Sequence, residues 1–140
     1  MITPFKGYHH ITNSVTNPQP DVDFHTKVLG LRLIKRTVLL DGDSPFYHLY
    51  YGKGVGIEGT LLTSFVITHR PAGKIGSGQV TAIGLSVPED SLDYWQQRLN
   101  EFGVPNTTRE RFDTKRIRIT HPDDIIYELI GVPIEGEQSW

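Results

Sequence analysis

Two adjacent histidines near the amino terminus are the side chains best suited to bind a metal ion. They stand in the run His9-His10-Ile11-Thr12, which is predicted to be part of a β-strand. Successive side chains of a strand point to opposite faces, so only one of the two imidazoles can bind a metal from this strand. Imidazole is the commonest metal ligand among protein side chains, but histidines in strands more often make structural hydrogen bonds. The dipeptide alone leaves both interpretations open.

A carboxylate and four further histidines are the other candidates. Glu128 lies in a predicted strand, where it would either bind a metal or face solvent. His48 stands in an aromatic strand and His121 precedes a proline in a turn, so both are expected to pack. His25 on a predicted helix and His69 in a loop are expected to be solvated. Because the chain has no cysteine, any metal must be held by nitrogen and oxygen ligands.

The composition narrows the class of protein. The 140 residues fit one domain that can bury a core without disulfides. A formal net charge of -2 gives no basic surplus to neutralise a phosphate backbone. No segment has the apolar core of a signal peptide or the roughly twenty apolar residues of a membrane span. We therefore expect a soluble, cytoplasmic protein that binds neither nucleic acid nor membranes.

The predicted elements of the first half form a strand, a helix and three more strands. Residues 8–15 are predicted as a strand, and apolar residues at helical spacing from Asp21 onward predict a helix that Gly30 ends. Three further strands are predicted at residues 31–40, 46–51 and 60–67. The first repeat is therefore a βαβββ unit of about residues 7–68.

The same order of elements returns in the second half. A strand is predicted at residues 79–87, followed by a helix that begins near Pro88 and ends at Gly103. Three more strands complete a second βαβββ unit of about residues 78–132; they are predicted at residues 107–112, 115–120 and 125–130. One such unit cannot bury both faces of its sheet, so two units are expected to pair around a concave surface in an α+β fold. A ferredoxin-like sandwich is the alternative.

Short motifs follow one another at characteristic spacings along most of the chain. They are Tyr8-His9-His10-Ile11-Thr12, Val22-Asp23-Phe24, Lys27-Val28-Leu29-Gly30-Leu31-Arg32, Tyr47-His48-Leu49-Tyr50-Tyr51-Gly52, Gly78-Gln79-Val80-Thr81, Val87-Pro88 and Ser91-Leu92-Asp93. With these motifs the chain resembles the amino-terminal domain of two-domain, hydroquinone-type ring-cleaving dioxygenases. These enzymes are members of the vicinal-oxygen-chelate superfamily, which also contains glyoxalases and bleomycin resistance proteins. The resemblance is specific in the first fifty residues and looser after Gly103.

The resemblance implies a set of site residues. The superfamily holds its metal with a histidine from the first strand of one unit and with a histidine and a glutamate from a partner unit. Carried onto this sequence, the first histidine is His10 and the glutamate position is Glu128. Aligning Val15 with Val87 sets Ala82 against His10, so the second histidine is absent. His9 and Thr12 resemble pocket residues beside the metal, with His9 a candidate for proton transfer and a packed, hydrogen-bonded strand as the alternative.

The resemblance further implies an Fe(II)-dependent extradiol-type cleavage of a hydroquinone- or catechol-like aromatic, with manganese or zinc as possible replacements for iron. Because the chain supplies too few ligands, the site is expected to be completed by a missing carboxy-terminal domain or by a homodimer partner. The isolated chain is expected to bind iron weakly or not at all, to be inactive and to associate as dimers or larger assemblies. Two alternatives stay open: a metalloenzyme homodimer resembling glyoxalases or fosfomycin resistance proteins, and a metal-free module that binds a small molecule.

Overall fold

The computed structural model describes residues 7–42, 44–57, 59–69, 71, 73–74 and 76–133. Contacts divide the chain into two compact units, with the division after Pro71. Each unit contains one four-stranded sheet of its own. Among the described residues, no helix combines the length and the apolar character needed to cross a membrane.

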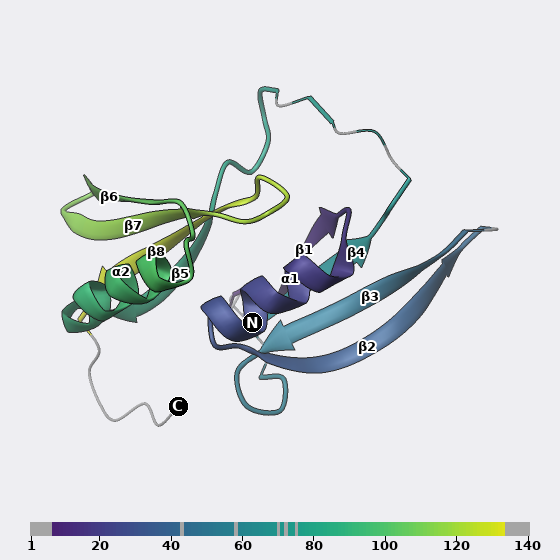
Figure 1. Ribbon diagram of the computed structural model, residues 1–140, viewed down its shortest axis with the longest axis horizontal. Helices are drawn as coiled ribbons and strands as arrows, with labels where there is room; N and C mark the ends of the chain where they lie inside the picture. The colour runs from purple at the N-terminus through teal and green to yellow at the C-terminus, as the bar shows by residue number, and fades with distance from the viewer. Residues whose placement is uncertain are drawn as a thin grey trace, which may run out of the picture. The chain divides into compact units, whose positions relative to one another are not determined.

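Unit 1 contains the first sheet and its helix (Figure 1). In chain order its elements are β1 (His10–Val15), α1 (Pro18–Asp23), the π-helical turn η1 (Phe24–Val28), β2 (Arg32–Asp41), β3 (Ser44–Gly52) and β4 (Leu61–Val66). The strands are ordered β1-β4-β3-β2. β1 runs parallel to β4, and the other pairs are antiparallel.

Unit 2 repeats this connectivity. Its elements are β5 (Ile83–Pro88), the short 3-10 helix η2 (Glu89–Ser91), α2 (Leu92–Glu101), β6 (Asn106–Arg111), β7 (Thr114–Thr120) and β8 (Ile126–Val132). The strands are ordered β5-β8-β7-β6, and β5 runs parallel to β8. The predicted α+β class with two βαβββ units is thereby confirmed.

The helix of unit 1 begins earlier than the apolar spacing predicted. Asn17 caps it by accepting a hydrogen bond from the Gln19 amide at 3.2 Å, and Pro18 occupies the first helical position. The last turn is a π-helix in which Phe24 and Val28 are buried. Gly30, with a φ of 72°, then reverses the chain into β2. The cap at Asn17 and the glycine at position 30 therefore define where the helical segment begins and ends.

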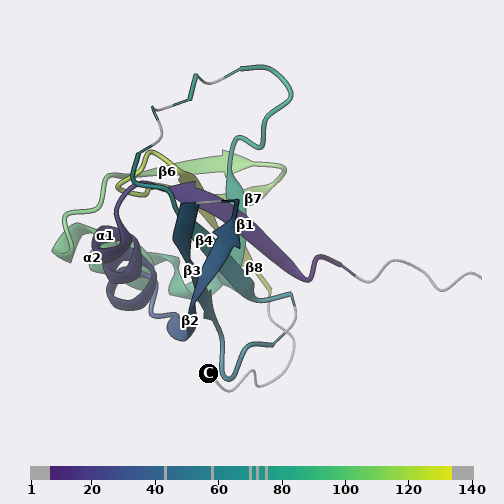
Figure 2. The same ribbon diagram turned by 90° about the vertical axis from the view of Figure 1, so that its right-hand side faces the viewer.

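Each sheet has one face that its helix covers. In unit 1 the buried residues of this face include Val15, Leu49, Leu62 and Val66. Figure 2 shows α1 lying to one side of the strands of its own sheet. Burying each such side chain stabilises the fold by about 1.5–3 kcal/mol. Among the described residues of unit 1 no helix covers the opposite face of the first sheet, and the predicted site residues His10 and Thr12 lie on that face.

Candidate functional site

The face of the first sheet opposite α1, which we call the open face, gathers most of the polar candidates of unit 1. Strand register and alternation place on it His10, Thr12 and Ser14 of β1, Leu61, Thr63 and Phe65 of β4, Phe46, His48 and Tyr50 of β3, and Lys35, Thr37 and Leu39 of β2. His10 and Thr12 are exposed. The open face therefore combines imidazole, hydroxyl and aromatic groups.

His10 is oriented by its neighbour His9. The Nδ1 atoms of the two rings lie 3.0 Å apart, and the rings meet at 86°. The predicted strand included His9, but β1 begins only at His10, so the two side chains are not held on opposite faces. If His10 Nδ1 donates to His9 Nδ1, His10 Nε2 has a lone pair for a metal. Metal-bound histidines usually donate their second ring N–H in this way, so His10 fits a single metal bond.

Thr12 lies next to His10 on the same face. The buried Thr63 hydroxyl donates a hydrogen bond to Thr12 Oγ1 at 2.8 Å. Because Thr12 accepts this bond, its own hydroxyl proton is available for another acceptor. Thr12 can therefore hydrogen-bond a molecule that approaches the open face.

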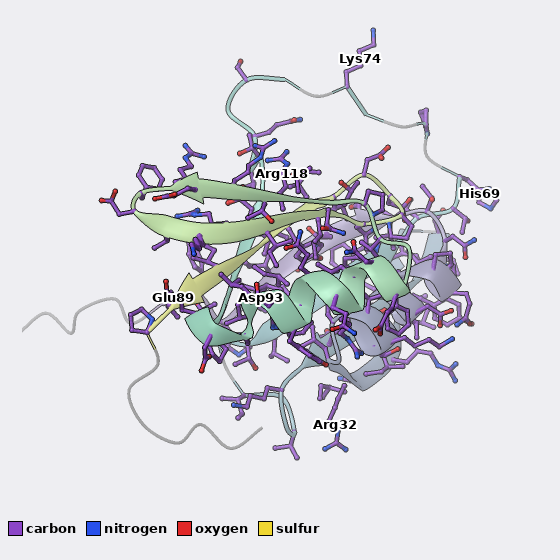
Figure 3. All side chains as sticks on the ribbon, turned by 60° about the vertical axis from the view of Figure 1, so that its left-hand side comes forward. Arg32, His69, Lys74, Glu89, Asp93 and Arg118 are labelled. Carbon is purple, nitrogen blue, oxygen red and sulfur yellow. The ribbon has the colours of Figure 1, made fainter. Side chains whose placement is uncertain are left out.

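Glu128 lies in unit 2 and is paired with two arginines of β7. Its Oε2 lies 3.1 Å from Arg116 Nη1, and its Oε1 lies 3.7 Å from Arg118 Nη1. Only 7% of Glu128 is exposed. Figure 3 shows Arg118 on the side of the β6–β7 hairpin away from α2. A metal ion bound by Glu128 would compete with both guanidinium groups for the carboxylate oxygens.

The register also shows what each unit has at the corresponding positions. In unit 1, Thr12 lies three residues before Val15 and pairs with Thr63. In unit 2, Gly84 lies three residues before Val87 and pairs with Glu128. Thr63 thus occupies the glutamate position of unit 1. The half-buried Ala82, just before β5, occupies the histidine position of unit 2 and has no donor atom. Within either unit taken alone, no three described His, Asp or Glu side chains bring ligand atoms within 4.8 Å of one another.

His48 packs as the sequence predicted, but it packs on the open face. Its ring lies 4.5 Å from the Phe65 ring, and its Nδ1 lies 2.9 Å from the Tyr50 hydroxyl. Burial, followed by the charges of His10 and Lys35, lowers the pKa of His48 below its ordinary value. The imidazole is therefore neutral at physiological pH.

A buried polar cluster on the helix side was not predicted. The Tyr51 hydroxyl donates to Asp21 Oδ2 at 2.6 Å, and the Ser64 hydroxyl donates to Asp21 Oδ1 at 3.1 Å. His25 Nδ1 donates to the Asp21 carbonyl oxygen at 2.8 Å and stacks on the Tyr51 ring at 4.2 Å. The expectation that His25 is solvated was wrong, because its exposed fraction is 0%. Asp21 and His25 are four residues apart, a spacing typical of pairs on a helix surface. The sequence signal that could have indicated their burial is the polar Ser64 within an otherwise apolar strand.

Comparison with known proteins supports the resemblance inferred from the motifs. The chain is 39% identical over 139 residues to a chlorohydroquinone/hydroquinone 1,2-dioxygenase of Sphingobium indicum, covering 96% of this chain and 43% of that protein. A solved structure of a candidate dioxygenase of Bacillus subtilis matches with a TM-score of 0.84 and 39% identity, covering 91% of this chain and 41% of that one. No family model matches the sequence. The chain thus spans about two fifths of the length of these relatives.

The fold has a wider set of neighbours. A glyoxylase/bleomycin resistance protein/dioxygenase domain from a Frankia species matches with a TM-score of 0.74 and 17% identity, covering 96% of each chain. At this identity the match concerns the fold alone. The chain therefore has the glyoxalase/bleomycin resistance fold and has ring-cleaving dioxygenases as homologues, and both predictions are confirmed.

Proposed function

We propose that this chain is the part of an Fe(II)-dependent, extradiol-type ring-cleaving dioxygenase that contributes one metal ligand, His10, to a site completed elsewhere. The observation that supports this most is the arrangement of His10, whose Nδ1 faces His9 while the ring lies on an exposed sheet face. The substrate class that we propose is a hydroquinone- or catechol-like aromatic, and the hydroquinone part of it is supported by the homologous chlorohydroquinone/hydroquinone 1,2-dioxygenase.

The donors of this chain fit one metal bond and do not complete a site within either unit. Ferrous iron takes two histidines and one carboxylate on one face and keeps open positions for substrate and dioxygen. His10 would supply one imidazole, and manganese or zinc could replace iron with the same ligand. Glu128, the second predicted ligand, is held by Arg116 and Arg118. The remaining ligands would come from a further domain or from a second copy of the chain.

The residues beside His10 have definite tasks in this proposal. Bound iron would supply the chemistry that brings dioxygen and the aromatic diol together. His9 holds the His10 ring through the Nδ1 contact and can accept a proton there. Thr12, fixed by Thr63, donates its hydroxyl proton to an oxygen of the bound aromatic. Together they position the ligand and the substrate on the open face.

A chimeric enzyme tests the proposal. This chain replaces the matching segment of the Bacillus subtilis relative, and iron content and oxygen uptake with hydroquinone are measured. We expect activity that His10→Ala lowers at least about 100-fold together with iron content, since lost ligation costs several kcal/mol. His69→Ala, in the loop after β4, is the matched control. Full iron and full turnover in His10→Ala would refute the proposal.

Glu128→Gln in the same chimera tests the second predicted ligand. Loss of iron in this variant would assign Glu128 to the metal, and unchanged iron would leave it as the partner of the two arginines. Both results are read against the His69→Ala control.

The proposal extends to assembly and location. Apolar side chains of the β2–β3 hairpin are exposed, among them Leu40 at 74% and Val38 at 55%. Such surface favours association, so we propose that the isolated chain forms dimers, which sedimentation analysis measures. The lack of cysteine fits the proposed cytoplasmic location.

A metal-free binding module is the second candidate function. It is favoured by the lack of a three-ligand cluster among the described residues of either unit by itself. Such a module would bind an aromatic molecule on the open face without iron, and the chimera would then stay inactive.

A further inference from the structure

One nitrogen of His48 is buried without a hydrogen-bond partner. The unpartnered atom is Nε2, and His48 is the only residue with such an atom among the described side chains. The other ring nitrogen, Nδ1, lies 2.9 Å from the Tyr50 hydroxyl. Native proteins rarely leave buried polar atoms unpaired, and an exception points to a bound water, an ion or a functional role.

The groups around His48 are the aromatic rings of Phe65 and Tyr50, with the Lys35 ammonium close to the Tyr50 ring. Phe65 lies 4.5 Å from the His48 ring and meets Phe46 at 5.3 Å in a T-shaped pair. The Tyr50 ring lies 4.2 Å away, with Lys35 Nζ 5.6 Å from its centroid. These rings lie on the open face: Phe65 is on β4, the neighbour of β1, whereas Phe46 and Tyr50 are on β3 with His48, two strands from His10. A flat aromatic molecule can pack against them beside His48.

The bond to Tyr50 determines what His48 offers a ligand. A phenolic O–H is the stronger donor and a neutral imidazole nitrogen the stronger acceptor, so Tyr50 donates to Nδ1. In that tautomer Nε2 carries the proton and is a donor. It pairs with an oxygen that can accept, such as a phenolic oxygen.

We infer that His48 Nε2 is a second contact for the substrate, where it donates a hydrogen bond to an oxygen of a hydroxylated aromatic ring that packs against Phe65. This inference rests on the proposed function for the class of ligand. It assigns His48 a binding role that neither iron nor His10 supplies. The contact selects rings that carry a hydroxyl group over rings of the same shape that do not.

Binding of phenols to the metal-free chain tests the inference. The whole chain, labelled with nitrogen-15 in its histidines, is titrated anaerobically with hydroquinone, phenol and toluene. We expect hydroquinone and phenol to shift the His48 Nε2 resonance. In His48→Phe we expect their dissociation constants to rise about 3- to 10-fold, as for one lost neutral hydrogen bond. The dissociation constant of toluene should stay the same, because it has no oxygen to accept the bond.

Two controls separate folding from binding. His69→Phe changes an exposed histidine in the loop after β4 and should leave all three affinities unchanged (Figure 3). Backbone amide spectra report whether His48→Phe keeps the fold, and the shift of the wild-type Nε2 resonance needs no variant at all.

The outcomes distinguish this inference from the proposed function. Equal affinity of hydroquinone for wild type and His48→Phe, with no Nε2 shift, overturns the role of His48 and leaves the ring-cleaving proposal intact. No saturable binding of any phenol to the metal-free chain also overturns it, while turnover by the chimera still decides the proposed function. An inactive chimera with selective phenol binding supports His48 within a binding module.

Discussion

The two units share one connectivity but distribute their polar groups in opposite ways. At corresponding register positions, unit 1 has Tyr51 and Ser64 where unit 2 has Ile119 and Leu129. Unit 1 thus buries a polar cluster around the Asp21 carboxylate next to its helix, and unit 2 has apolar side chains at the corresponding positions. On the other face, unit 1 leaves an imidazole exposed, and unit 2 neutralises Glu128 with arginines. A βαβββ unit can therefore bury a carboxylate on the helix face of its sheet, as with Asp21, or on the opposite face, as with Glu128. In both cases hydrogen bonds or ion pairs satisfy the carboxylate oxygens.

The helix-side cluster provides the largest expected difference between the units. Asp21→Ala should lower the free energy of unfolding by about 3–5 kcal/mol, because the Tyr51 and Ser64 hydroxyls lose their buried acceptor. The exposed Asp93 at the start of α2 is the matched control, and Asp93→Ala should cost less than about 0.5 kcal/mol. Urea denaturation measures both. Equal costs for the two variants would remove the distinction.

The sheet-face carboxylate of unit 2 provides the next effect. Glu128→Gln should lower the free energy of unfolding by about 2 kcal/mol, because it leaves two partly buried guanidinium groups without a counter-charge. Thr63→Val changes the corresponding position of unit 1 and should cost about 1 kcal/mol, as for one neutral hydrogen bond. A smaller cost for Glu128→Gln than for Thr63→Val would show that the arginines have other partners.

Transfer of the histidine from one unit to the other sharpens the comparison further. Ala82→His places an imidazole just before β5. The first pair of that strand is Ile83 with Tyr127, so Glu128 lies one residue beyond this first pair on β8. We expect the affinity for Co(II), measured by calorimetry, to rise about tenfold, which corresponds to about 1.4 kcal/mol. Ala82→Phe is the control for packing. If Ala82→His binds no more Co(II) than Ala82→Phe does, the two positions do not form a ligand pair.

The smallest expected effect is a pH dependence confined to unit 1. The pKa of His48 is lower in the folded protein than in the unfolded chain, so the unfolded state takes up a proton first as the pH falls. The stability from neutral His48 is therefore fully present above pH 6.5 and is lost as the pH falls toward the folded-state pKa. His48→Phe should show a smaller drop in urea midpoint between pH 7.5 and 5.5 than wild type. An unchanged drop would assign the effect to other histidines.

The order of elements was predictable because it depends on local signals. Gly30 and Gly103 end the helices, and the alternation in Tyr47-His48-Leu49-Tyr50-Tyr51 defines a strand with two different faces. The motifs near His10 also identified the candidate ligand. Each of these features is determined by residues that lie close together in the sequence.

The contacts of Glu128 and the burial of His25 depend on pairing between distant strands, and a single sequence does not determine that pairing. Arg116 and Arg118 share a face of β7, but only the register with β8 shows that both meet Glu128. The burial of His25 depends on Tyr51 and Ser64, which lie 26 and 39 residues further along the chain. The contact of His9 with His10 was not predicted, because β1 begins two residues later than the strand predicted at residues 8–15 and leaves His9 outside it.

The position of His10 has a consequence for the motions of unit 1. His10 is the first residue of β1, which within its own sheet is an edge strand with β4 as its single neighbour. Edge strands open at lower free energy than central ones, so amide hydrogens of β1 should exchange with solvent faster than those of β3. A ligand that binds His10 only when β1 is paired with β4 would therefore stabilise this paired state, and its observed affinity would be lower by the free energy needed to form it. Slower amide exchange along β1 would then report occupancy of the site before any reaction takes place.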